Sequence, residues 1–138
     1  MDYLVFTQDE LPMENGTRQW DGCLFRETNV SIILVDAPPG GGPRLHRHPY
    51  PEVFVIHEGQ ALFTIGSSLV HARAGQVLIV PKGVPHKFVN TGQGRLRQTD
   101  IHPATKVQTE WLESSEQECE EPSLRPQNAQ GVRPRAGA

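Results

Sequence analysis

The chain has 138 residues, a length at which a single domain can bury a core without disulfide bridges. Its 13 basic and 16 acidic residues give a net charge of −3, which argues against binding to the phosphates of nucleic acids. No apolar run approaches the about 20 residues of a membrane-spanning helix. The N-terminal stretch contains Asp2 and Asp9 and lacks the basic and apolar segments of a signal peptide. We therefore expect a cytoplasmic protein that binds neither nucleic acid nor membrane, with Cys23 and Cys119 as thiols.

Short runs of Val, Ile, Leu and Phe recur along residues 1–112, with turn residues between them. The chain contains 13 Gly and 12 Pro, which favours many turns over long helices. Short strands at roughly 8–12-residue spacing are typical of antiparallel sandwiches and barrels. The expected strands are 3–6, 30–35, 52–57, 61–65, 77–80, 86–89 and 95–101. The sequence therefore predicts an all-β, antiparallel fold.

The dipeptide Glu58-Gly59 predicts a two-residue hairpin turn between strands 52–57 and 61–65. Such a hairpin pairs Ile56 with Ala61 and Phe54 with Phe63, and alternation turns these side chains toward the barrel interior. The side chains expected to face inward are those of Phe54, Ile56, Ala61, Phe63, Ile65 and Phe88. Those expected to face outward are Val53, Val55 and His57.

The chain changes character after Leu112. Residues 113–138 contain only Leu124 and Val132 as branched aliphatic side chains, so they cannot bury enough apolar surface to offset the entropy lost on ordering. We expect one folded domain over residues 1–112 and a disordered tail over 113–138, which the domain does not need for folding.

Four residues carry most of the functional signal: His46, His48, Glu52 and His86. Residues two apart on a strand share a face, so His46 and His48 can point at one place. Glu52 opens the next strand, and His86 follows the turn at 81–83. Imidazole together with carboxylate suits a divalent transition metal such as Fe, Mn, Ni or Zn.

The spacing of these residues resembles the cupin family. The first cupin motif, G-x5-H-x-H-x3-E-x6-G, is present from Gly40 to Gly59. The second, G-x5-P-x-G-x2-H-x3-N, is present from Gly75 to Asn90. The short interval between the motifs is similar to that of small single-domain microbial cupins. This resemblance implies a double-stranded β-helix, the cupin jelly-roll barrel, with His46, His48, Glu52 and His86 as metal ligands.

The surroundings of the metal are expected to form a largely apolar pocket for a small molecule, or simply to fill a small barrel. If Gln98, Asp100 and His102 face inward, they are candidates for contacts behind the metal ligands or for acid–base groups. If Arg97, Thr99 and Ile101 face inward instead, Arg97 is a candidate for holding an anionic substrate. Tyr50 is interpreted as a packed side chain, and His57 and His71 are not expected to be ligands. The candidate pocket residues are Phe54, Ile56, Phe63, Phe88, Gln98, Asp100 and His102.

The predicted function is that of a metal-dependent enzyme acting on a small organic molecule, with a dioxygenase-type oxidoreductase favoured. Four protein ligands on an octahedral ion leave two positions open for substrate, or for substrate and O₂. Decarboxylases, isomerases and lyases of the family that this chain resembles use the same ligands, so they remain alternatives. A non-catalytic module that binds a small molecule, with a structural metal, is the alternative from another class.

Strand 30–35 is apolar on both faces in its central part, from Ile32 to Val35. An antiparallel strand of a solitary barrel normally has one polar face, so its outer face is expected to be covered. Cupins commonly pair, and the resemblance implies a homodimer. The alternative is that residues 1–20 of the same chain fold over this face.

Overall fold

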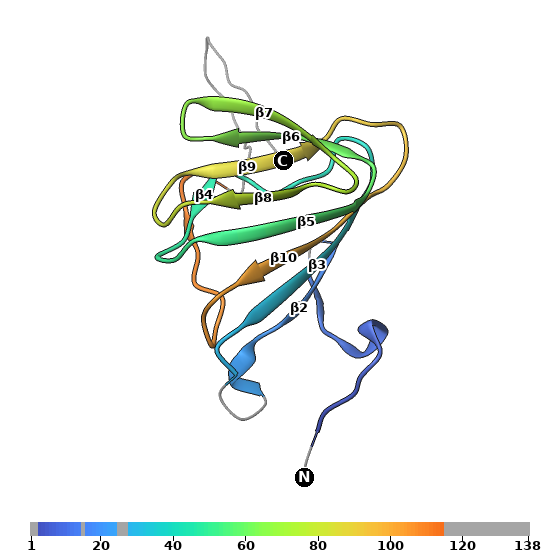
Figure 1. Ribbon diagram of the computed structural model, residues 1–138, viewed down its shortest axis with the longest axis vertical. Coiled ribbons are helices and arrows are strands. Elements are labelled where there is room, and N and C mark those ends of the chain that lie inside the picture. The colour runs from blue at the N-terminus through green and yellow to red at the C-terminus, as the bar shows by residue number, and fades with distance from the viewer. Residues whose placement is uncertain (1–2, 15, 25–27, 115–138) are drawn as a thin grey trace, which may run out of the picture.

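The computed structural model describes residues 3–14, 16–24 and 28–114, which form two antiparallel sheets facing each other (Figure 1). Two short 3-10 turns, η1 (Gln8–Glu10) and η2 (Gly22–Leu24), are the helical segments of this part of the chain. The strands are β1 (Met13–Glu14), β2 (Thr17–Trp20), β3 (Ser31–Ala37), β4 (His46–Arg47), β5 (Glu52–Glu58), β6 (Gln60–Ile65), β7 (Ser68–Arg73), β8 (Val77–Val80), β9 (His86–Asn90), β10 (Leu96–His102) and β11 (Glu110–Trp111). The predicted all-β jelly roll is confirmed. No helix in the described ranges is long and apolar enough to span a membrane.

The strands divide between a six-stranded sheet, in the order β1-β2-β3-β10-β5-β8, and a five-stranded sheet, in the order β11-β4-β9-β6-β7. Strands that follow each other in the sequence therefore often lie in different sheets. The chain crosses from β5 in one sheet to β6 in the other at Gly59, whose φ is 87°. This alternation between the sheets is what makes the barrel a double-stranded helix.

The predicted hairpin at Glu58-Gly59 is wrong. Strand β5 pairs with β10 and β8, whereas β6 pairs with β7 and β9. Ile56 lies opposite Gln98, and Ala61 lies opposite Asn90. The hairpin rule misleads here because β5 and β6 each bury one face in the same core. The resulting alternation of buried and exposed residues is the same whether the two strands pair in a hairpin or cross between sheets.

The predicted inward faces are nevertheless confirmed, because both sheets turn those residues toward one core. Phe54, Ile56, Ala61, Phe63 and Phe88 are buried, and Ile65 packs against them from the edge. The rings of Phe54 and Phe63 meet edge to face, with centroids 5.0 Å apart, across the space between the sheets.

The N-terminal segment differs from prediction. Residues 3–6 are not a strand, because no other strand of the described chain pairs with them. Strand β2, which was not predicted, pairs with β3 and widens the six-stranded sheet. Residues 17–20 therefore lie beside β3 as its neighbour in the sheet.

Residues 103–113, called the strap below, follow β10 and return to the five-stranded sheet, where β11 pairs with β4. The Glu113 carboxylate accepts the Leu45 N–H at 2.8 Å and lies 3.0 Å from Lys87 Nζ. Contacts with the barrel thus extend to Glu113, past the predicted boundary at Leu112. Apolar composition does not indicate them, because Glu113 is held by its charged side chain and not by buried apolar surface. The rest of the predicted tail, 115–138, with Cys119, lies outside the described residues; Cys23 is a free, exposed thiol.

Candidate metal centre

The four predicted ligands come together between the two sheets. His46 on β4 lies directly opposite His86 on β9, and His48 follows β4 closely in the chain. Glu52 begins β5 and reaches the cluster from the other sheet. One nitrogen or oxygen atom of each residue lies within 4.8 Å of those of the other three. All four residues are between 2% and 7% exposed.

Each of the three histidines uses Nδ1 to contact a main-chain carbonyl oxygen. A carbonyl oxygen can only accept, so Nδ1 carries the hydrogen and the opposite nitrogen, Nε2, is left with a lone pair in the neutral ring. The contacts are His46 to Arg44 at 2.7 Å, His48 to Gln108 at 2.7 Å and His86 to Val84 at 2.9 Å. Partners of this kind fix the orientation of imidazoles that bind metals through Nε2.

Burial and charge around these groups favour a cation. Burial lowers the pKa of His46 to about 4, so its imidazole is neutral at pH 7. Burial alone would raise the pKa of Glu52, but its contacts with His102, His48 and His86 outweigh that effect and hold the pKa well below its usual range. A carboxylate and several imidazoles, of which His46 is neutral at pH 7, therefore face one another in a buried site.

The distances within the cluster also indicate a positive charge between these groups. Nε2 of His48 and Nε2 of His86 each lie 3.0 Å from Oε1 of Glu52, and the buried Nε2 of His48 has no aligned hydrogen-bond partner. With Nδ1 protonated, each contact needs a positive charge between nitrogen and oxygen, either a proton on each ring or one shared ion. Three imidazole nitrogens and one carboxylate oxygen fit a divalent transition metal ion.

A cavity of about 910 Å³ adjoins this cluster. Ile33, Val35, Phe54 and Phe88 give it an apolar wall, and His46, His48 and Glu52 also line it. Of the predicted pocket residues, the structure places Phe54, Phe88, Asp100 and His102 in the lining. The other three, Ile56, Phe63 and Gln98, are not among the lining residues of this cavity, and their side chains are packed inside the barrel.

Strand β10 turns Gln98, Asp100 and His102 inward, which decides between the two predicted orientations. The alternative that Arg97 holds an anionic substrate is wrong, because Arg97 faces outward, with its Nε 3.8 Å from Glu58. Gln98 Nε2 donates to Asp100 Oδ1 at 2.8 Å. Burial first, and the nearby charge of Glu52 second, raise the pKa of Asp100 well above its usual value, which favours the protonated carboxyl group.

Sequence reasoning missed several residues beside the cluster. The hydroxyl of the buried Tyr50, interpreted only as a packed side chain, bonds to His102 Nδ1 at 2.8 Å. Burial raises the pKa of Tyr50 to about 12, so this hydroxyl keeps its proton. At the cavity mouth the Trp111 ring lies 5.1 Å from the His46 ring and 4.2 Å from the Arg44 guanidinium carbon. No sequence signal links these positions, because each contact joins segments far apart in the chain.

The other two histidines lie away from the centre, as expected. His57 Nε2 is hydrogen-bonded to the Thr99 hydroxyl at 2.9 Å on the outer face, and His71 on β7 is exposed. The three ligand histidines thus come from β4, the residue just after it and β9 of the five-stranded sheet, whereas Glu52 comes from β5 of the six-stranded sheet.

Comparisons with known proteins agree with this geometry. An uncharacterized protein of Streptomyces coelicolor, SCO3923, is 34% identical over 87 residues, which are 61% of this chain and 81% of that protein. The HTH-type transcriptional regulator PuuR of Escherichia coli is 31% identical over 108 residues, which are 74% of this chain and 57% of the regulator.

Solved structures with the same fold include oxalate oxidase, with a TM-score of 0.67 and 22% identity, covering 81% of this chain and 65% of that one. A structure describing the Mn(II) centres of Bacillus subtilis oxalate decarboxylase superimposes with a TM-score of 0.65 and 26% identity, covering 73% of this chain and 29% of that one. The chain thus spans less than two thirds of either enzyme. The Cupin domain family matches residues 33–102, just over half of the chain. This chain is therefore a member of the cupin family.

Proposed function

We propose that this cupin is a metal-dependent enzyme acting on a small organic molecule, and that it is an oxidoreductase of the dioxygenase type. The observation that carries the proposal is the cavity of about 910 Å³ that reaches His46, His48 and Glu52. A volume of this order suits a small ligand. The four protein groups leave two positions free on an ion that prefers six, so a substrate in the cavity has access to the ion.

A redox-active ion such as Fe or Mn would supply the O₂ chemistry, or act as a Lewis acid on a substrate oxygen. The chain's own residues would bind and orient the substrate. The apolar wall of Ile33, Val35, Phe54 and Phe88 excludes water from a carbon skeleton. The carboxyl group of Asp100 also lines the cavity, and in the protonated form that its burial favours it can donate a hydrogen bond to a substrate oxygen.

The resemblance to oxalate decarboxylase, at 26% identity, supports a second enzymatic candidate, the reaction of a decarboxylase, isomerase or lyase, which consumes no O₂ overall. The similarity to PuuR supports a candidate of a different class, a module that binds a small molecule without turnover. In that case the same cavity would serve as the sensor pocket of a regulatory protein.

The decisive experiment starts with protein purified without added metal, whose bound metal is identified by elemental analysis. O₂ uptake and CO₂ release are then measured, with and without O₂, on a panel of enols, diketones and small carboxylates. The inactive control is Glu52→Gln, and the matched neutral control is His57→Gln on the outer face of the same strand.

Metal-dependent O₂ uptake that is lost in Glu52→Gln and kept in His57→Gln would support the dioxygenase. Turnover without O₂ would replace it with the Lewis-acid reaction. Saturable binding of a panel compound with no turnover of any compound under either atmosphere would favour the regulatory module.

A further inference from the structure

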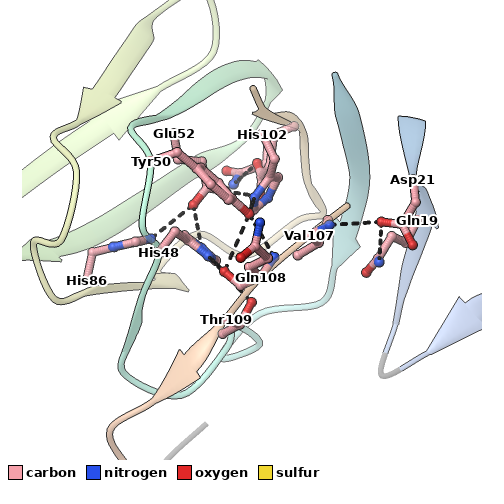
Figure 2. Close-up of polar contacts among 12 residues, drawn as sticks. Gln19, Asp21, His48, Tyr50, Glu52, His86, His102, Val107, Gln108 and Thr109 are labelled. Carbon is pink, nitrogen blue, oxygen red and sulfur yellow. Dashed lines mark hydrogen bonds and ion pairs between the residues drawn. The ribbon is translucent and has the colours of Figure 1, made fainter. Parts of the chain in front are cut away.

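The strap carries polar contacts that lead into the metal cluster from outside the two cupin motifs. Figure 2 shows these contacts running from Gln19 and Asp21, through Val107 and Gln108, to His48 and Tyr50. We propose that Tyr50, His102 and the main chain of Gln108 are positioning groups that together orient the metal ligands Glu52 and His48. The proposal rests on the metal site and not on the reaction that takes place there.

The main chain of Gln108 contacts both a metal ligand, His48, and the buried Tyr50. Its carbonyl oxygen accepts the Nδ1 hydrogen of His48 at 2.7 Å, and its N–H donates to the hydroxyl oxygen of Tyr50 at 3.0 Å. One residue therefore sets the ring orientation of a metal ligand and the position of a buried tyrosine. The Gln108 side chain is exposed, so its chemical identity plays no part.

The direction of the remaining hydrogen bonds follows from this contact. Because the Tyr50 oxygen accepts the Gln108 N–H, its own hydrogen is free to point at His102 Nδ1, 2.8 Å away. The other acceptor within reach, the Gln108 carbonyl oxygen, is 3.5 Å away. His102 Nδ1 is then an acceptor, and the hydrogen of the neutral ring lies on Nε2.

His102 thus has the opposite tautomer to the three ligand histidines. Its Nε2 presents an N–H, not a lone pair, and lies 3.1 Å from Oε2 of Glu52. The other carboxylate oxygen, Oε1, faces Nε2 of His48 and of His86. This division of the carboxylate assigns Oε1 to the ion and Oε2 to His102, so His102 acts through Glu52 and not as a fifth ligand.

Two buried nitrogens support this assignment. Nε2 of His48 and Nε2 of His102 both lack an aligned hydrogen-bond partner, although each lies close to the Glu52 carboxylate. A buried donor or acceptor left without a partner is destabilising. An ion on Oε1, together with a small rotation of the carboxylate toward His102, satisfies both nitrogens.

The strap itself is anchored by Asp21, which precedes β3, and by Ser31, the first residue of β3. Asp21 Oδ1 accepts the Val107 N–H at 3.0 Å and a Gln19 side-chain N–H at 3.1 Å. The Ser31 hydroxyl donates to the Ala104 carbonyl at 2.8 Å. Asp21 and Gln108 both lie outside residues 33–102, the part that the Cupin domain family matches. The geometry of this metal centre therefore depends on segments at both ends of the family domain.

The test measures Mn²⁺ binding to the metal-free full-length chain by EPR. The signal of free Mn²⁺ gives the dissociation constant, and the spectrum of the bound ion reports on its surroundings. Tyr50→Phe removes one oxygen atom and breaks both of its hydrogen bonds. We expect the dissociation constant to rise about 10- to 100-fold, with a changed spectrum of the bound ion. Thr99→Val, which removes a hydroxyl from a 2.9 Å contact on the outer face, and Gln108→Ala, which keeps the main chain, should both bind Mn²⁺ like the wild type.

A double-mutant cycle separates positioning from general destabilisation. Because Tyr50 acts through His102, Tyr50→Phe should change the dissociation constant little once His102→Leu is present. His102→Gln retains an N–H donor toward Glu52 and should recover part of the affinity that His102→Leu loses.

Asp21→Asn provides a variant away from the buried cluster, should the Tyr50 or His102 variants fail to fold. It weakens the anchor of the strap, and we expect several-fold weaker Mn²⁺ binding with the same direction of spectral change. Wild-type affinity and spectrum in Tyr50→Phe, or in Asp21→Asn if only that variant folds, would overturn the proposal. So would fully additive effects in the cycle.

Discussion

Asp100 is a buried carboxyl group in the lining of the cavity, and its surroundings favour the protonated form. Burial first, and the charge of Glu52 second, raise its pKa well above the 3.8 of an unperturbed Asp. As the pH rises above 3.8, the unfolded chain loses a proton that the folded chain still holds. The stability of the wild type therefore decreases with pH until the raised pKa is passed.

Asp100→Asn removes this penalty and keeps the size of the side chain. Below pH 3.8 this group should make no difference between the melting temperatures of the metal-free wild type and variant. Above pH 3.8 the variant should become more stable than the wild type. The gain should grow as the pH rises from 3.8 toward the raised pKa of Asp100, because the folded wild type keeps a proton there that the unfolded chain has lost. A variant less stable than the wild type at pH 7 would show that the carboxyl group is ionised in the folded protein.

His48 and His86 each present Nε2 to Glu52 at 3.0 Å, so removing either should open the ligand set. We expect His48→Ala and His86→Ala to lose most of their bound metal while the barrel stays folded by circular dichroism. Elemental analysis of the purified proteins measures this, with His57→Ala as the control. Wild-type metal content in both variants would contradict the assignment of the ligands.

The sequence was sufficient to predict these ligands because the spacing of His46, His48, Glu52 and His86 is itself the signal. The groups behind them could not be predicted. Tyr50 and His102 are 52 residues apart, and the Gln108 groups that contact Tyr50 and His48 belong to the main chain. Every residue but proline has the same main-chain donor and acceptor, so no residue type marks such a position.

At the scale of elements, strands with clear alternation were predicted closely, as β5 and β9 show. Strand β7 was missed because Leu69 and His71 on it are exposed, so it lacks a continuous apolar face. The pairing of β5 with β6 was wrong because alternation specifies which face a residue shares and not which strand lies beside it. In a jelly roll, strands that follow each other in the sequence can share the core without pairing, so the buried face of a strand does not identify its neighbour.

Gly59, where the chain crosses between the sheets, offers a test of this topology. Its φ is +87°, and an added Cβ would lie 2.4 Å from the Arg95 carbonyl oxygen. Gly75 has a similar φ of +92°, with nothing within 4 Å of an added Cβ. We expect Gly75→Ala to lower the free energy of unfolding by about 1–2 kcal/mol through backbone strain alone.

Gly59→Ala should lower it by more, about 3 kcal/mol or above, because the clash with main-chain atoms adds to the same strain. Urea unfolding of both variants measures the difference. Equal losses would mean that Arg95 does not approach the crossover as closely as the structure describes.

At the scale of the whole molecule, part of the outer face of the six-stranded sheet is apolar. Val77 and Ile79 on β8 are each 62% exposed, and they lie opposite Val55 and Val53 on β5. Strand β2 pairs with β3 edge to edge and leaves this part of the face open. Because a solvated antiparallel sheet normally has a polar outer face, we propose that a second copy of the chain covers it.

Light scattering at micromolar concentration should then give twice the 15.3 kDa mass of one chain. Ile79→Lys should shift the mass toward that of the monomer. Leu69→Lys, at a position 67% exposed on β7 in the other sheet, is the matched control and should not. A wild-type mass of one chain would show that the face remains uncovered in solution.

The order of strands in the six-stranded sheet has a consequence for when the new chain can fold and bind its metal. Strand β3 pairs with β10 over its whole length, from Ser31 opposite His102 to Leu96 opposite Ala37. The six-stranded sheet therefore cannot close before residue 102 has left the ribosome, and chains dominated by such distant pairings fold slowly. The ligands, drawn from both sheets, meet only at that late stage.

An ion held by the native state alone stabilises that state by a free energy that rises with the logarithm of its free concentration, once this exceeds the dissociation constant. Metal supply in the cell would then act on newly made barrels after they close, and it would govern how many of them escape degradation.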